Sequence, residues 1–190
     1  MSPIASGSIV TFTNVGSGTC IDLAAGNTSK GAAISGWKCH GGANQNWRLQ
    51  QVDKTGPWPV YMIQNQASGS SSFQATDDYG ESHADNIEYI AYMDLSYGGT
   101  TDGTPIVGWQ GNATGAPNPH QRWRFITGDP HKGNVVVIQN IAAGTVTDLY
   151  LGRRPNGTGV NGWTQSPDLS SGNTHQQWKV TVSVTPSTAA

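Results

Sequence analysis

An aspartate followed fifteen residues later by a tryptophan recurs three times along this chain of 190 residues. A carboxylate accepts strong, charge-assisted hydrogen bonds from adjacent hydroxyl groups, and an aromatic ring can cover a flat apolar face. A sugar offers both features, since it has polar edges and, in galactose, one apolar face. The spacing therefore predicts three related binding sites, built on Asp22 and Trp37, Asp94 and Trp109, and Asp148 and Trp163.

Each copy ends in Gln-x-Trp, and the residue before the glutamine differs between copies. In the first copy it is Asn44, whose amide can donate to a sugar oxygen while Gln45 orients Asp22. We therefore predict the strongest site in the first repeat, with Lys38 and His40 at its rim. A histidine replaces the asparagine elsewhere, and a neutral imidazole can also donate to a hydroxyl. The weaker predicted sites comprise Asp94, Trp109, His120 and Gln121 in the second repeat, and Asp148, Trp163, His175 and Gln176 in the third.

Structural roles compete with this interpretation. An aspartate beside a strand end commonly bonds its own backbone in a turn. The spacing from tryptophan to glutamine grows from eight residues in the first copy to twelve and thirteen, and longer loops can cover a pocket. Arg153 and Arg154 in the third copy can pair with Asp148 or be solvated. The second tryptophan of each copy falls in a closing strand and is predicted to pack in the core: Trp47, Trp123 and Trp178.

The elements that must position these residues are short strands. Alternating apolar residues predict a strand at Ile9–Asn14, and the pattern restarts at Val60–Asn65 and Val135–Asn140. Repeats of four strands cannot bury their own apolar faces, so they must close against one another. The sequence therefore predicts an all-β fold, a β-trefoil of three four-stranded repeats with pseudo-threefold symmetry.

The same pattern sets the expected boundaries. Residues 1–190 are predicted to form a single domain, with repeats at about 9–55, 56–130 and 131–184. The second repeat carries an insertion within 67–92 that holds five of the twelve acidic residues, and we expect a protruding loop or small hairpin there.

Composition argues against several classes of function. Only 12% of the residues are charged and the net charge is -2, which argues against nucleic-acid binding. No apolar run approaches the roughly 18 residues of a membrane span, so no membrane insertion is expected. The N-terminus lacks the basic and apolar regions of a signal peptide, which predicts a cytoplasmic protein. Cys20 and Cys39 make no zinc site, so no metal or cofactor is expected, and both a bridge and reduced thiols fit their positions.

The sequence contains no catalytic motif of a serine hydrolase, zinc protease or phosphate-binding enzyme. Paired carboxylates for glycoside hydrolysis occur in the insertion, at Asp77, Asp78 and Glu81, where a solvated acidic face is the simpler interpretation. We therefore predict that the protein is not an enzyme.

Coupled motifs in this chain resemble those of the ricin B-chain-like lectins: the Gln-x-Trp repeats, Cys20-Ile-Asp-Leu with Trp37-x-Cys39, and Asn44-Gln-x-Trp47. The resemblance covers residues 9–184 and is closest to the single-domain ricin-B-like lectins of mushrooms. It implies a lectin that recognises terminal galactose or N-acetylgalactosamine, chiefly through the first repeat.

The resemblance also implies the partners and the setting. Galactose-terminated glycans or glycoproteins would be the partners of a monomer or homodimer, and a defensive role against fungus-eating animals would follow. Two alternatives stay open. One is a trefoil protease inhibitor that presents the loop Ala67–Tyr92, and the other is a carbohydrate-binding module with a different sugar preference.

Overall fold

Short strands with alternating burial make up most of the chain. In β1 (Ile9–Asn14) every second side chain is buried, which is the pattern of a strand with one face on a core. The computed structural model describes residues 4–54, 56, 58–67, 75–76, 82–83, 90–114, 117–127, 133–167 and 173–186.

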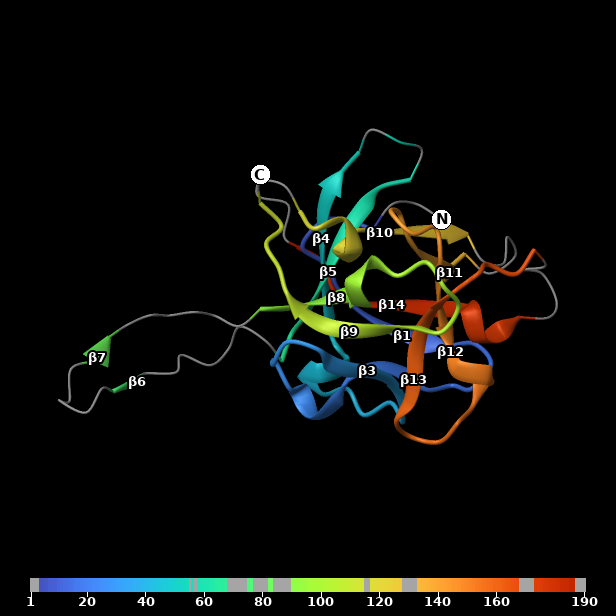
Figure 1. The fold of residues 1–190 in the computed structure, drawn as a ribbon, viewed down its shortest axis with the longest axis horizontal. Coiled ribbons are helices and arrows are strands. Elements are labelled where there is room, and N and C mark those ends of the chain that lie inside the picture. Colours follow the sequence, from blue (N-terminus) through green and yellow to red (C-terminus); the bar gives the residue numbers. More distant parts are fainter. Residues whose placement is uncertain are drawn as a thin grey trace.

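Six strands close into a barrel (Figure 1). Besides β1 these are β4 (Trp47–Asp53), β5 (Val60–Asn65), β10 (Trp123–Thr127), β11 (Val135–Asn140) and β14 (Trp178–Val184). Antiparallel pairing runs through them in this order and returns from β14 to β1, so every barrel strand has two neighbours. Closure removes the exposed edges that an open sheet would leave.

Three hairpins, one per repeat, join into a triangular cap. They are β2 (Cys20–Leu23) with β3 (Ala32–Trp37), β8 (Ala91–Leu95) with β9 (Thr104–Gln110), and β12 (Val146–Leu149) with β13 (Thr158–Trp163). The second strands β3, β9 and β13 each pair with the other two. A six-stranded barrel with three linked hairpins is a β-trefoil, which confirms the predicted fold class.

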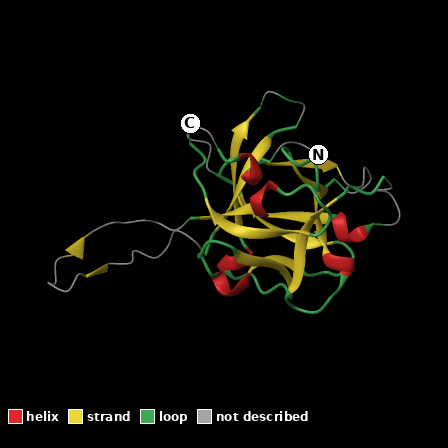
Figure 2. Cartoon of the chain, in the orientation of Figure 1, coloured by secondary structure: helices red, strands yellow, loops and turns green. Residues whose placement is uncertain are grey.

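Two sets of short 3-10 helices flank the hairpins (red in Figure 2). The first set follows the first strand of each hairpin: η1 (Ala24–Gly26), η3 (Ser96–Gly98) and η5 (Tyr150–Gly152). The middle residue of each has a left-handed φ of 53°, although none is glycine: Ala25, Tyr97 and Leu151. The second set precedes the closing strands: η2 (Ala43–Gln45), η4 (Pro119–Gln121) and η6 (Thr174–Gln176).

The hydrophobic core includes the tryptophans of the three Gln-x-Trp motifs. Trp47, Trp123 and Trp178 are fully buried, as predicted. Each indole N–H donates to a backbone carbonyl of the first hairpin strand in its own repeat, at 3.1, 2.9 and 3.3 Å. A buried indole needs such a partner, so these contacts tie the cap to the barrel three times.

The acidic insertion of the second repeat lies between β5 and β8. Its described residues include β6 (Ala75–Thr76) and β7 (Ser82–His83), which pair antiparallel and lie away from the barrel in Figure 1. The five acidic residues that the sequence places there, including Asp77, Asp78 and Glu81, lie outside the described residues. Within the described part of the chain, no helix is long and apolar enough to cross a membrane.

Candidate functional site

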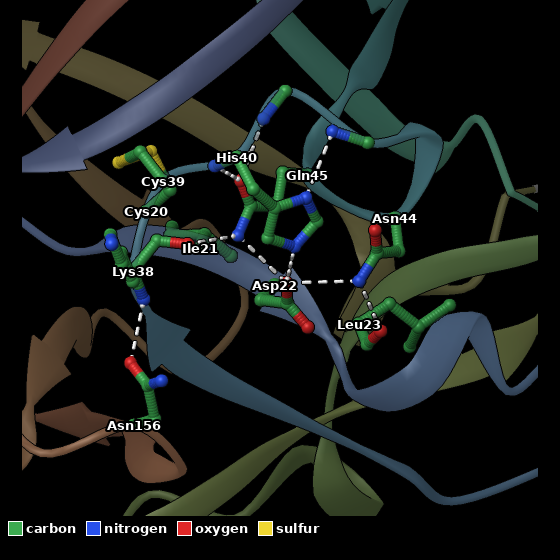
Figure 3. Close-up of polar contacts among 12 residues, drawn as sticks. Cys20, Ile21, Asp22, Leu23, Lys38, Cys39, His40, Asn44, Gln45 and Asn156 are labelled. Atoms are coloured by element: carbon green, nitrogen blue, oxygen red, sulfur yellow. Dashed lines mark hydrogen bonds and ion pairs between the residues drawn. A yellow bond between two sulfur atoms is a disulfide. The ribbon is translucent and has the colours of Figure 1, made fainter.

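The carboxylate of the first repeat is held by three side chains. Asp22 lies on β2 and is almost fully buried. Its Oδ2 accepts from Asn44 Nδ2 at 2.9 Å and from Gln45 Nε2 at 2.8 Å (Figure 3). His40 Nε2 lies 3.4 Å from the same oxygen. The other oxygen, Oδ1, has no hydrogen-bond partner among the described residues and is turned away from the three donors in Figure 3. One half of the carboxylate is therefore fixed by the protein and the other half can accept from a ligand.

Gln45 is the residue that connects this carboxylate to the loop after β3. It is fully buried, and its Nε2 also donates to the carbonyl of Lys38 at 3.0 Å. Its Oε1 accepts from the backbone N–H groups of His40 at 2.8 Å and Gly41 at 3.3 Å. All hydrogens of this amide are used inside the protein, so Gln45 positions Asp22 and does not face a ligand.

Asn44 and His40 have defined donor and acceptor roles. Asn44 Nδ2 donates to Asp22 and, at 3.3 Å, to the carbonyl of Leu23, which uses both amide hydrogens. The carbonyl oxygen of the amide therefore remains for a ligand hydroxyl, whereas the sequence suggested a donor. His40 Nδ1 accepts from the backbone of Gly42 at 3.1 Å, so Nε2 carries the proton directed at Asp22.

Trp37 lies on the same face of the hairpin as Asp22. The β2–β3 register places Cys20 opposite Trp37 and Asp22 opposite Ser35, and directly paired residues share a face. Trp37 is 39% exposed, unlike the core tryptophans. The ring is therefore available as an aromatic surface two positions along the hairpin from the carboxylate.

A disulfide between Cys20 and Cys39 braces the first repeat alone. Their Cα atoms are 5.1 Å apart, and the bridge links β2 to the segment just after Trp37 (Figure 3). The loop that it anchors continues into His40 and Gly41, the backbone partners of Gln45. The sequence left the state of these cysteines open, and the structure shows them bridged.

Each tryptophan at the second strand of a hairpin rests against a glycine of a different repeat. A Cβ placed on Gly157 would lie 3.9 Å from Trp37, one on Gly31 would lie 3.8 Å from Trp109, and one on Gly103 would lie 3.8 Å from Trp163. These glycines have φ values of 81–87°, a conformation that other residues rarely adopt. The turn of one repeat therefore forms part of the wall of another repeat's site.

The second repeat contains a hollow of about 180 Å³. It is lined by Asp94, Ser96, Tyr97, Trp109, Asn118 and His120. Tyr97 is 88% exposed, and its ring centroid lies 6.5 Å from that of Trp109. Two aromatic rings thus flank the carboxylate here, whereas the first repeat has Ala25 where Tyr97 stands.

The carboxyl of Asp94 is costly to ionise. Burial raises its pKa above the ordinary value, while a hydrogen bond from Gln121 and the proximity of His120 oppose the rise. His120 can occupy its position because Gly98 has no side chain, since a Cβ there would collide with the imidazole ring. Gln121 also donates to the carbonyl of Gln110 at 3.0 Å, as Gln45 does to that of Lys38.

In the third repeat a histidine faces the carboxylate directly. His175 Nδ1 lies 3.3 Å and 3.5 Å from the two oxygens of Asp148. The imidazole therefore contacts both carboxylate oxygens, whereas one oxygen of the equivalent Asp22 is free of partners among the described residues. Burial raises the pKa of Asp148; a hydrogen bond from Gln176 and the contact with His175 lower it, and nearby Asp102 raises it. Arg153 lies over the ring of Tyr150 at 5.2 Å, and among the described residues no ion pair joins it to Asp148.

A family model for ricin-type beta-trefoil lectin domain-like proteins matches residues 3–109 and 119–189 of this chain. The chain belongs to this lectin-like family. Membership confirms the resemblance noted from the sequence. Among curated proteins, no match was found.

Solved structures show the same fold. The Rhizoctonia solani agglutinin is 25% identical, covers 94% of this chain and 98% of its own, and has a TM-score of 0.63. The Macrolepiota procera ricin B-like lectin, solved with lactose, is 23% identical over 94% and 98% of the two chains, with a TM-score of 0.62. ThreeFoil, a designed threefold-symmetric protein, gives 20% identity, 93% and 99% coverage and a TM-score of 0.67.

The structure of this ricin-type family member brings most of the predicted residues of each repeat together around its aspartate. In the first repeat it assembles Asp22, Asn44, Gln45 and His40, with Lys38 contributing its backbone and an exposed side chain. Gln121 and Gln176 are buried like Gln45 and serve as positioning residues. In the described part of the chain, no group of three or more His, Cys, Asp or Glu residues could hold a metal ion.

Sequence reasoning missed two contributors to these sites. Tyr97 is the third residue after Asp94, a position that holds Ala25 and Leu151 in the other repeats, so its aromatic character was visible in the alignment of repeats. Asn156 accepts from the backbone N–H of Lys38 at 2.7 Å, across the boundary between the first and third repeats. No pattern within one repeat reveals that contact.

Proposed function

We propose that this chain is a lectin that binds terminal galactose or N-acetylgalactosamine, with its best-defined site in the first repeat. The observation that carries the proposal is the asymmetry of Asp22. Its Oδ2 is engaged by Asn44, Gln45 and His40, while Oδ1 is free to accept beside the exposed ring of Trp37.

The geometry suits a pyranose with adjacent hydroxyl groups at one edge. Two such hydroxyls donate to the carboxylate oxygen, and the charge strengthens both bonds. A third hydroxyl donates to the free carbonyl oxygen of Asn44. The apolar face of galactose covers Trp37, which lies on the same hairpin face. A sugar that turns a polar edge toward the ring loses this contact, and that loss provides the selectivity.

Binding at a single site is expected to be weak. One stacking contact and a few hydrogen bonds on an open surface give about -4 to -6 kcal/mol, which corresponds to millimolar to high-micromolar affinity. The second and third repeats add sites around Asp94 and Asp148, and several weak sites on one molecule raise the avidity for a multivalent glycoprotein.

A titration tests the assignment. Calorimetry or NMR with lactose and N-acetylgalactosamine should show saturable binding at millimolar concentration, and cellobiose, which ends in glucose, should bind less. Asp22→Ala should remove the binding that belongs to the first repeat. Absence of binding by any galactoside at these concentrations would rule out the proposed specificity.

We predict a cytoplasmic location, galactose-terminated glycans as partners, a monomeric or dimeric state and a defensive role from the sequence and from the family. The alternative of a protease inhibitor depends on the loop Ala67–Tyr92, most of which lies outside the described residues, and no described contact favours it.

A further inference from the structure

Three equivalent glycines, Gly31, Gly103 and Gly157, pack against the hairpin tryptophans. The residue before each of them lies at the rim of a site in another repeat. Asn156 Oδ1 accepts from the backbone of Lys38, next to Trp37. In the same way Asp102 Oδ1 accepts from the backbone N–H of Thr164 at 2.6 Å and from its hydroxyl at 2.8 Å, next to Trp163. The first and third sites therefore have a neutral and an acidic rim residue, each hydrogen-bonded to the residue that directly follows the tryptophan.

In the second site this position is Lys30, which precedes Gly31 beneath Trp109. A lysine has no acceptor, so it cannot make the contact that Asn156 and Asp102 make. Instead a hollow of about 440 Å³ opens there, lined by Thr28, Ser29, Lys30 and Gln110. The closing contact of the other two sites is thus replaced by an open space beside the aromatic ring.

The hollow offers hydrogen-bond donors to an anion. Lys30 is exposed and has no ion-pair partner among the described residues. Thr28 and Ser29, whose side chains carry hydroxyl groups, line the same hollow. Gln110 follows Trp109 directly, so the hollow borders the proposed sugar site, whose own lining includes Asp94, Tyr97 and the same tryptophan.

We propose that the second repeat binds acidic galactosides, with the sugar between Tyr97 and Trp109 and a carboxylate or sulfate substituent at Lys30. This inference rests on the proposed galactoside binding and adds a charge preference to one of its sites. The third repeat, with Asp102 at the equivalent rim position, disfavours the same substituent by charge repulsion.

The test compares neutral lactose with lactose that carries a sulfate or a sialic acid at the 3′ or 6′ position, titrated at low and at moderate salt. The matched variants are Lys30→Asn, which introduces the rim residue of the first site, and Lys179→Asn, which removes one exposed positive charge from β14. An exposed ion pair contributes up to about 1 kcal/mol, so at least one acidic lactose should bind the unmodified protein about threefold to fivefold more tightly than lactose. The difference should shrink with salt.

Lys30→Asn should abolish the preference for the acidic derivatives over lactose, whereas Lys179→Asn should preserve it. A gain with sulfate alone or with sialic acid alone identifies the anionic group. If lactose binds and no acidic derivative binds more tightly, or if Lys30→Asn retains the preference, this inference is wrong while the proposed lectin function stands. If no galactoside of either kind binds, the proposed function itself fails, and the inference falls with it.

Discussion

Replacing Asp22 with asparagine distinguishes the role of its bonded oxygen, Oδ2, from the role of its free oxygen, Oδ1. In Asp22→Asn the donors Asn44 Nδ2 and Gln45 Nε2, at 2.9 and 2.8 Å, still require an acceptor at the Oδ2 position. The new amide must therefore place its oxygen there and its NH2 group where Oδ1 was. The ligand then meets a donor in place of a charged acceptor, although the shape of the site is unchanged.

The expected loss follows from that exchange. A hydrogen bond to a charged group contributes about 1.5–3 kcal/mol, so galactoside affinity at the first site should fall about 10- to 100-fold. Folding should be little affected, because the inner oxygen keeps its partners. We expect the free energy of unfolding to change by less than about 1 kcal/mol, and Asp22→Ala, which strips both donors of their acceptor, to cost more.

The indole N–H signal of Trp37 in an NMR titration with lactose reports the first site directly. The buried indoles of Trp47, Trp123 and Trp178 provide internal references that should not shift. Asp94→Asn is the matched control, since it alters the second site only and should leave the Trp37 response intact. An unchanged Trp37 titration in Asp22→Asn would refute the role given to the free oxygen, and a large loss of stability would refute the fixed orientation of the amide.

Three further predictions address the fold around the sites. Cys39→Ser opens a loop of 19 residues and should lower the free energy of unfolding, measured by chemical denaturation, by about 3 kcal/mol. A thiol titration of the unreduced protein should find no free thiol. Reduced cysteines, which the predicted cytoplasmic location favours, would instead react with the thiol reagent. Gly98→Ala should weaken galactoside binding at the second site and lower the melting temperature, because the new methyl group collides with His120 and φ is 63°. Asp94 and Asp148 have raised pKa values in the folded state, so the native protein holds their protons more tightly than the unfolded chain does. The free energy of unfolding should therefore fall as the pH rises from the ordinary pKa of 3.8 through the raised values. Asn at both positions should flatten this slope in thermal melts at a series of pH values, and an unaltered slope would contradict the burial argument.

Much of the architecture could be predicted because it repeats. The spacing of Asp22 and Trp37 recurs in register, and the alternation of apolar residues predicted the strand Ile9–Asn14 to the residue. The roles of the core tryptophans followed from their place in closing strands. These features depend on local periodicity and on the need of each repeat to bury an apolar face, both of which are visible in one sequence.

The features that the sequence left open or missed depend on geometry between segments. Bridging of Cys20 to Cys39 requires the β2–β3 register, and the use of both Asn44 hydrogens requires the distance to the carbonyl of Leu23. The contact of Trp37 with Gly157 depends on how the third hairpin meets the first after the cap has closed. Residues 118 or more apart in the chain cannot be matched by a pattern that repeats within a single copy.

The packing of each hairpin tryptophan on another repeat's glycine means that the binding unit is out of phase with the sequence repeat. A unit of this kind consists of the carboxylate, amide and ring of one copy and the turn of another. A single repeat excised from the chain would carry the carboxylate, amide and ring of one site and the turn of a different site, but no complete site. Exchanging one repeat for a homologous one would alter two sites at once. Binding specificity in this trefoil therefore depends on pairs of adjoining repeats and not on single repeats.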